Sequence, residues 1–203
     1  MAKPVTRKIP LKNLLAEVRA CRLCEQHLPL GPRPVVRAKS SARLLIIGQA
    51  PGTKVHASGI PWDDPSGERL REWMGVDSDT FYNEAKIAIM PMGFCYPGKG
   101  KSGDLPPRTE CAEQWHEKIL RNLPKLELTL LVGSYAQDYY LADGETTFAT
   151  LTERVQAWKK FTPRHLPLVH PSPRNRLWLK KNPWFEQQVV PYLRRRVKTL
   201  VNK

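Results

Sequence analysis

The chain has 203 residues, of which 41% are hydrophobic and 26% are charged, as in an ordinary globular domain. Its 33 lysines and arginines outnumber its 19 aspartates and glutamates, and the net charge of +14 favours a polyanionic partner such as nucleic acid. No stretch approaches the ~18 apolar residues of a membrane span or resembles a signal peptide, so we expect a cytoplasmic protein. A single domain is expected over residues 1–203, with an N-terminal helix and a cysteine pair in residues 1–40 and the core in residues 41–203.

Apolar side chains at helical spacing predict the helices of this core. One helix, which carries Leu70 and Trp73, is expected to stop at Gly75. Another is expected to begin at Pro107. The last is expected to follow an N-cap at Asn182 and to kink where a proline interrupts it.

Four short apolar runs predict the strands of one sheet, over residues 43–47, 86–90, 128–132 and 166–169. Because helical patterns lie between them, the strands are expected to run parallel. Ligands of such sheets bind at the carboxyl ends of the strands. The turns that follow the four runs are therefore expected to meet at one edge of the sheet and to form the functional site.

The turn after the first run, GQAPG at residues 48–52, is a candidate phosphate site. It lacks the lysine of a nucleotide-binding P-loop. A second candidate ends at Gly100 and Lys101, but Cys95 stands where a P-loop needs its first glycine. We therefore expect Lys99 and Lys101 to contact the phosphates of a nucleic-acid backbone instead.

The cysteines are Cys21, Cys24, Cys95 and Cys111, and the first two form a C-x-x-C pair. Disulfides are rare in the cytosol, so we expect free thiols. Cys95 follows the second strand and Cys111 lies near the start of the next helix, so the fold could bring all four together. Four thiolates suit either Zn²⁺ or an iron–sulfur cluster, and unrelated buried cysteines are the alternative.

Two further segments carry candidate chemical groups. Trp62 stands beside Asp63 and Asp64 in the loop after GQAPG, where an indole can stack on a flat ring and a carboxylate can activate water. The alternative is that these acids cap the next helix. His170 lies at the end of the fourth apolar run, in the segment His170–Asn175, which two prolines make rigid. We expect His170 at the same edge of the sheet as the acids.

Together, residues 48–52, the acidic loop, the cysteines and His170–Asn175 resemble the uracil-DNA glycosylase superfamily, over most of the chain from Cys21 to Asn175. The resemblance implies an α/β fold of three layers, α/β/α, with a central four-stranded, mainly parallel sheet. It also implies that residues 48–52 hold an extruded base and that His170 faces the base carbonyl. The cysteine pattern is similar to that of families 4 and 5, which implies a [4Fe–4S] cluster.

Departures from the family patterns indicate a family 5-like or divergent family 4-like protein. Family 4 has a glutamate where this chain has Gln49, and an asparagine in the second-strand loop, which here reads Met90-Pro91-Met92. Family 1 has its catalytic aspartate where this chain has Ala50. Family 5 also has an alanine there and places an aspartate in a Gly-Asp-x-Ser-Gly segment, to which Asp64–Gly67 is similar. We therefore expect the substrate to be uracil, hypoxanthine, xanthine or another damaged base.

The resemblance implies a monofunctional base-excision repair glycosylase, a monomer that acts on DNA containing a damaged base. Asp64 is expected to orient water and His170 to stabilise the departing base. The residues expected to bind the base are Gln49, Ala50, Pro51, Gly52, Trp62 and Asn175, and those expected to contact DNA are Lys99, Lys101, Ser172 and Arg174. Two alternatives are a non-catalytic nucleic-acid-binding module on the same fold and a covalent DNA-capturing relative, for which His56 is the available reactive residue.

Overall fold

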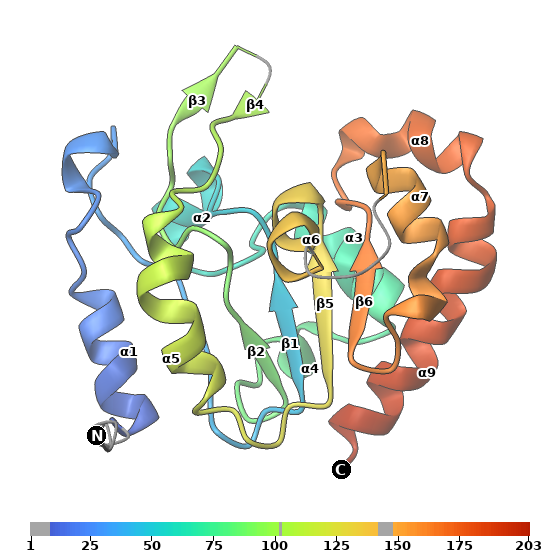
Figure 1. Ribbon diagram of the computed structural model, residues 1–203, viewed down its shortest axis with the longest axis horizontal. Coiled ribbons are helices and arrows are strands. Elements are labelled where there is room, and N and C mark those ends of the chain that lie inside the picture. The colour runs from blue at the N-terminus through green and yellow to red at the C-terminus, as the bar shows by residue number, and fades with distance from the viewer. Residues whose placement is uncertain (1–8, 102, 142–147) are drawn as a thin grey trace, which may run out of the picture.

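A four-stranded parallel sheet forms the centre of the molecule (Figure 1). The computed structural model describes residues 9–101, 103–141 and 148–203, so the expected domain over residues 1–203 extends beyond the described residues. The strands lie in the order β2-β1-β5-β6, and every neighbouring pair is parallel. Their bounds are Leu44–Ile47 for β1, Ile87–Ile89 for β2, Leu128–Val132 for β5 and His165–Leu168 for β6. The four predicted strands and their direction are confirmed.

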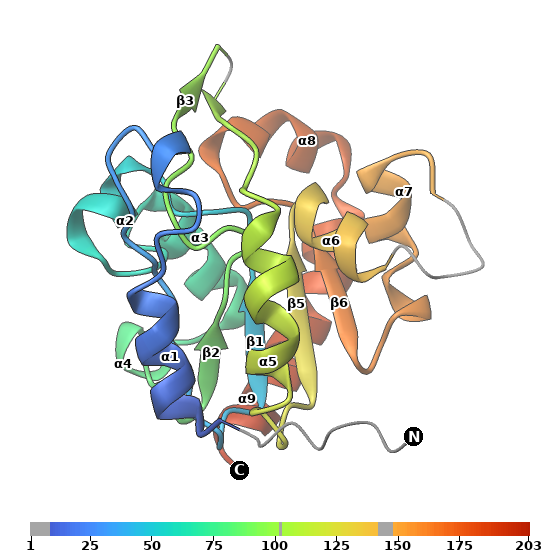
Figure 2. The ribbon, with the colours of Figure 1, turned by 60° about the vertical axis from the view of Figure 1, so that its left-hand side comes forward.

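Helices cover both faces of this sheet, which makes three layers (Figures 1 and 2). Side chains of a strand alternate between faces, so Leu44 and Ile46 pack with α3, α7, α8 and α9, while Leu45 and Ile47 pack with α1, α5 and α6. The helix bounds are Leu11–Arg19 (α1), Thr53–Ser58 (α2), Pro65–Met74 (α3), Ser78–Phe81 (α4), Glu117–Leu120 (α5), Ser134–Tyr140 (α6), Leu151–Gln156 (α7), Arg176–Lys181 (α8) and Val190–Val201 (α9). The predicted α/β/α architecture is confirmed. Within the described part of the chain, none of these helices is long and apolar enough to cross a bilayer.

Helix α3 shows how local sequence sets the position of the site. Asp64 is its N-cap and Pro65 its first residue, a position that suits proline because no intrahelical partner is needed for its nitrogen. Leu70 and Trp73 bury one face of the helix against the sheet. The helix ends at Gly75 in the left-handed conformation, φ 68°, as predicted.

The helix that carries Cys111 begins at Glu110 rather than at Pro107. A Cβ atom on Gly93 would lie 3.0 Å from the Cβ of Pro107, so this proline packs closely on the second-strand loop in an extended connection. The helix then contains a wide π-turn over Ala112–His116. Local sequence periodicity carries no signal for this π-turn.

The C-terminal helical run begins beside Pro183, as expected, but Asn182 does not act as its side-chain cap. The amide nitrogen of Asn182 donates instead to the carbonyl of Trp178, at 2.8 Å. A π-turn over Phe185–Val189 precedes α9, in which Pro191 occupies the first turn. Because proline cannot donate a backbone hydrogen bond, the irregularity predicted there takes the form of this wide turn.

Candidate active site

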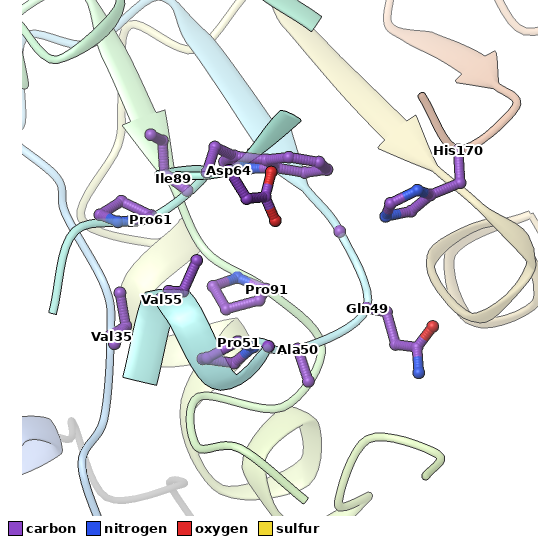
Figure 3. A pocket seen from close by; sticks show the side chains of 13 residues that line it. Val35, Gln49, Ala50, Pro51, Val55, Pro61, Asp64, Ile89, Pro91 and His170 are labelled. Atoms are coloured by element: carbon purple, nitrogen blue, oxygen red, sulfur yellow. The ribbon is translucent and has the colours of Figure 1, made fainter. Parts of the chain in front are cut away.

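A cavity of about 60 Å³ lies at the carboxyl ends of β1 and β2. Several chain segments line it: Val35, residues 48–52 with Val55 of α2, the loop from Pro61 to Asp64, Ile89 with Pro91, and His170 (Figure 3). By comparison, a closed cavity of ~150 Å³ holds benzene. The cavity is smaller than one that encloses benzene, so it cannot enclose a whole nucleobase. A bound base would leave one edge in the open mouth of the cavity or displace a residue of its wall.

Hydrogen bonds to the second-strand loop fix the backbone of residues 48–52. The amide of Met92 donates to the carbonyl of Gly48 at 2.8 Å, and the amide of Gly93 donates to the carbonyl of Gln49 at 2.9 Å. The side-chain amide of Gln49 points away from the cavity centre and donates to the carbonyl of Leu105 at 3.0 Å (Figure 3). The predicted base-binding residues Gln49, Ala50, Pro51 and Gly52 all line the cavity. The side chain of Gln49 is held by its hydrogen bond to Leu105 and does not point into the cavity.

Trp62 forms one wall of the cavity and lies against residues 48–52. A Cβ atom on Gly48 would lie 2.8 Å from the Cζ2 atom of Trp62, so only glycine leaves room for the indole. The backbone of Trp62 has a φ of 59°, which is unusual for a bulky residue. Its carbonyl approaches so closely that a Cβ atom on Gly67 would lie 1.8 Å from it. The indole faces the ring of His170, with 5.6 Å between the ring centroids.

Asp64 caps α3 and also lines the cavity, so its position is compatible with both roles considered from the sequence. Its Oδ1 atom accepts a hydrogen bond from the amide of Gly67 at 2.8 Å and thereby caps α3. The same carboxylate points into the cavity (Figure 3). Because the cap fixes one oxygen, the position of the other oxygen is also restricted. Asp63 is exposed and does not belong to the cavity wall.

The imidazole of His170 accepts a hydrogen bond at Nδ1 and faces the indole of Trp62. The amide of Ser172 donates to its Nδ1 at 3.2 Å, so the neutral ring carries its proton on Nε2. Burial lowers the pKa of His170, and the charge of Asp64 offsets only part of that effect. A neutral ring that can donate from Nε2 is therefore the state near pH 7.

Asn175 supports His170 and does not line this cavity. Its side-chain nitrogen donates to the carbonyl of His170 at 2.7 Å. Ser172, predicted to contact DNA, accepts a hydrogen bond from the amide of Arg174 on its hydroxyl at 3.3 Å, and thereby caps the short 3₁₀ turn Pro173–Asn175. The segment is rigid because of these local bonds as well as its prolines.

A hairpin of β3 (Lys99–Gly100) and β4 (Gly103–Asp104) projects beyond the same edge of the sheet (Figures 1 and 2). Lys99 and Lys101 are exposed on it. A Cβ atom on Gly103 would lie 3.0 Å from a guanidinium nitrogen of Arg174, so the hairpin meets the His170 segment. The predicted DNA-contacting residues therefore lie on one side of the molecule.

Asp104 is an acidic residue near the site that the sequence did not single out. Its Oδ2 would lie 3.4 Å from a Cβ atom on Gly52. Burial raises the pKa of Asp104, whereas the charges of Arg174 and Lys99 lower it and that of Asp64 raises it further. An aspartate in a glycine-rich turn carries no sequence signal for such a position, because only the fold of the hairpin places it there.

The four cysteines line a smaller cavity of about 20 Å³, here called the cysteine cavity, which shares no lining residue with the cavity beside Asp64 and His170, here called the base cavity after the role expected for it. Burial, together with the nearby cysteines, raises the pKa of Cys95 to about 11 and that of Cys111 to about 12. The thiols of Cys95 and Cys111 are therefore protonated at pH 7. Among the described residues, no three His, Cys, Asp or Glu side chains are grouped closely enough to hold a metal ion. The cysteines converge, and the iron–sulfur cluster remains a prediction.

Comparison with known proteins identifies the family. One solved structure similar to this chain is that of wild-type Pedobacter heparinus SMUG2, with 19% sequence identity, coverage of 80% of this chain and 77% of that chain, and a TM-score of 0.43. The family model described as the uracil DNA glycosylase superfamily matches residues 36–194. That range includes Asp64, His170 and the whole wall of the base cavity except Val35. Because the match extends over most of the chain, the protein belongs to the uracil-DNA glycosylase superfamily.

Proposed function

We propose that the protein is a monofunctional DNA glycosylase that extrudes a deaminated base and hydrolyses its N-glycosidic bond. The observation that carries this proposal is the convergence of Trp62, Asp64 and His170 on one cavity at the edge of the sheet. An aromatic wall, a fixed carboxylate and a neutral imidazole are the groups that such a reaction needs. Extrusion costs a few kcal/mol and costs least at a mismatch, which favours deaminated bases.

The reaction proceeds with Trp62 stacked on the extruded base. As the C1′–N bond breaks, its electron pair moves into the base, and the Nε2–H of His170 donates to the base oxygen that becomes negative. Asp64 orients a water molecule whose oxygen bonds to C1′, and its negative charge stabilises the positive charge on the sugar. The water proton leaves through the carboxylate, and the released base anion takes a proton from solvent.

We infer selectivity among bases from the apolar part of the cavity wall. Val35, Val55, Ile89 and Pro91 belong to this wall, and all four are apolar and buried. Apolar walls reject an altered base weakly, whereas a hydrogen-bonding group rejects it strongly. The wall therefore supports release of hypoxanthine or xanthine as well as uracil.

The four cysteines are proposed to hold a [4Fe–4S] cluster. Their four side chains line one cavity, and four cysteine thiolates are the usual ligands of such a cluster. The cluster would fasten the loop that carries Cys95, which leads into the DNA-contacting hairpin. Iron and sulfide analysis of protein purified without oxygen tests this proposal. The Cys111→Ser variant is expected to lose iron. Wild-type protein that contains no metal, or contains zinc, would contradict the proposal.

A base-release assay tests the catalytic proposal. Oligonucleotides with uracil, hypoxanthine or xanthine are incubated with wild-type protein and the His170→Ala variant, and free base is measured before alkali treatment. Wild type is expected to release base without cutting the strand, and His170→Ala to be about 100-fold slower or worse. Tight DNA binding without release would instead support the non-catalytic module.

A further inference from the structure

A second cavity opens at the same edge of the sheet, on the other side of His170. It has a volume of about 370 Å³, larger than the base cavity. Its walls come from the carboxyl ends of β5 and β6 and from α6, α7 and α8. The two cavities share Gln49 and His170 as lining residues. An occupant of the second cavity therefore lies about one side chain away from an extruded base.

Two aromatic residues form the walls of this second cavity. Tyr135 is 38% exposed and reaches the cavity from α6. Trp178 is fixed, because its indole N–H donates to the hydroxyl of Thr152 at 2.8 Å and its ring meets Trp184 and Phe185 edge-on. With its N–H used inside the protein, Trp178 presents a rigid apolar surface to the cavity. Flat rings of a ligand bind well to such walls.

The charge of the cavity indicates which part of DNA it suits. Of the described residues that line it, none is a lysine, arginine, aspartate or glutamate, and its polar groups include Ser134, Thr152 and Asn175. A phosphate would need cationic partners, whereas a nucleobase is flat, uncharged and able to hydrogen-bond with hydroxyl and amide groups. The exposed residues Arg174, Arg176 and Lys180 are close in sequence to the lining residues Asn175 and Trp178.

We propose that this cavity is a subsite for the nucleobase next to the extruded nucleotide on the same strand. The inference rests on the proposed glycosylase function, which places the damaged base in the first cavity. The same strand is favoured because the two cavities share a wall, and consecutive nucleotides are the bases that lie this close. Removing two adjacent bases from a duplex costs more than removing one, so this subsite favours single-stranded or frayed DNA over intact duplex.

Single-stranded oligonucleotides with one uracil test the subsite. The nucleotide on its 5′ or 3′ side is either intact or a tetrahydrofuran abasic analogue, and kcat/KM is measured for each. Removal of the neighbouring base on one side is expected to lower the wild-type kcat/KM about 5- to 100-fold, the usual effect of one stacked base. With the intact oligonucleotide, Tyr135→Ala is expected to lower kcat/KM by the same factor relative to wild type. Removal of the neighbouring base is then expected to lower the kcat/KM of this variant little further.

Two variants serve as controls. Tyr135→Phe keeps the aromatic face and is expected to retain wild-type dependence on the neighbouring base. Tyr139→Ala removes a tyrosine of the same helix that is 48% exposed and lies outside the cavity wall, and it is expected to behave as wild type. Thermal unfolding of all three variants checks that each is folded.

The outcomes separate the subsite from the proposed function. If wild type excises uracil equally well with either neighbouring base removed, the subsite is wrong and the glycosylase function stands. If wild type releases no base, the glycosylase proposal is wrong. The subsite is then judged by the fluorescence of 2-aminopurine beside a tetrahydrofuran in single-stranded DNA. Quenching that Tyr135→Ala abolishes and Tyr139→Ala retains supports it, and equal quenching by both variants overturns it.

Discussion

Replacement of Asp64 by asparagine and by alanine separates its two roles. The carboxylate caps α3 through the 2.8 Å bond from the amide of Gly67, and it also faces the base cavity. Asparagine caps a helix about as well as aspartate but carries no negative charge. Asp64→Asn therefore removes the proposed catalytic group and leaves the cap, whereas Asp64→Ala removes both.

The structure gives different magnitudes for the two effects. Loss of the single capping bond in Asp64→Ala is expected to cost about 1 kcal/mol of unfolding free energy, and Asp64→Asn a few tenths at most. Loss of a positioned carboxylate is expected to slow excision about 10²- to 10⁴-fold in both variants. Urea unfolding measures the first effect, and single-turnover release of uracil from an oligonucleotide measures the second.

Asp77 provides a matched control. It caps α4 with the same geometry, an Oδ1 atom 2.8 Å from the amide of Thr80, at the opposite end of the sheet from the site (Figure 1). Asp77→Ala is expected to lose stability without loss of excision. If Asp64→Asn excises uracil within about fivefold of wild type, the assignment of Asp64 as the water-orienting group is refuted, and the residue is a cap alone.

Three further predictions follow from contacts around the site. Gly48→Ala places a Cβ atom 2.8 Å from Cζ2 of Trp62, so it is expected to displace the indole and lower kcat/KM for base release about 5- to 100-fold with little loss of stability in urea unfolding. Burial lowers the pKa of His116 from its ordinary 6.5 to about 4, so the unfolded chain binds a proton there before the folded protein does. The unfolding free energy is therefore expected to fall by about 3 kcal/mol as the pH drops from 7 to 4, and His116→Gln is expected to flatten this dependence; an unchanged slope would contradict the assignment. Lys99→Gln and Lys101→Gln are each expected to reduce the slope of log binding constant against log salt by about 1, measured by fluorescence anisotropy, and a slope equal to that of wild type would remove the hairpin from the DNA interface.

The sheet could be predicted from the sequence because each strand is apolar on both faces. Residues such as Leu44 and Leu45 are both fully buried, on opposite sides of the sheet. Such continuous apolar runs are typical of parallel strands covered by helices. The position of the site could be predicted from the same pattern, because parallel strands place all their carboxyl ends at one edge of the sheet.

The side-chain amides could not be assigned from the sequence. Gln49 and Asn175 were both expected to contact the base, yet each donates to a backbone carbonyl of the protein, that of Leu105 and that of His170. A sequence motif identifies which residues gather at a site. It does not show whether the side-chain amide of an asparagine or glutamine binds the substrate or a backbone group of the protein. The wide turn at Ala112–His116 was also missed, since local sequence periodicity carries no signal for it.

The position of the acid is explained by the way Trp62, Asp64 and Gly67 fit together. Residues 48–52 contain no carboxylate, so the proposed mechanism takes the charge that stabilises the sugar from another segment. Gly67 donates its amide to Asp64 and, having no Cβ atom, admits the carbonyl of Trp62. The start of α3 thereby fixes the stacking ring and the carboxylate in one rigid turn. A shift of either group moves the other, so in the proposed mechanism this turn sets the geometry of the base relative to the water that attacks its sugar.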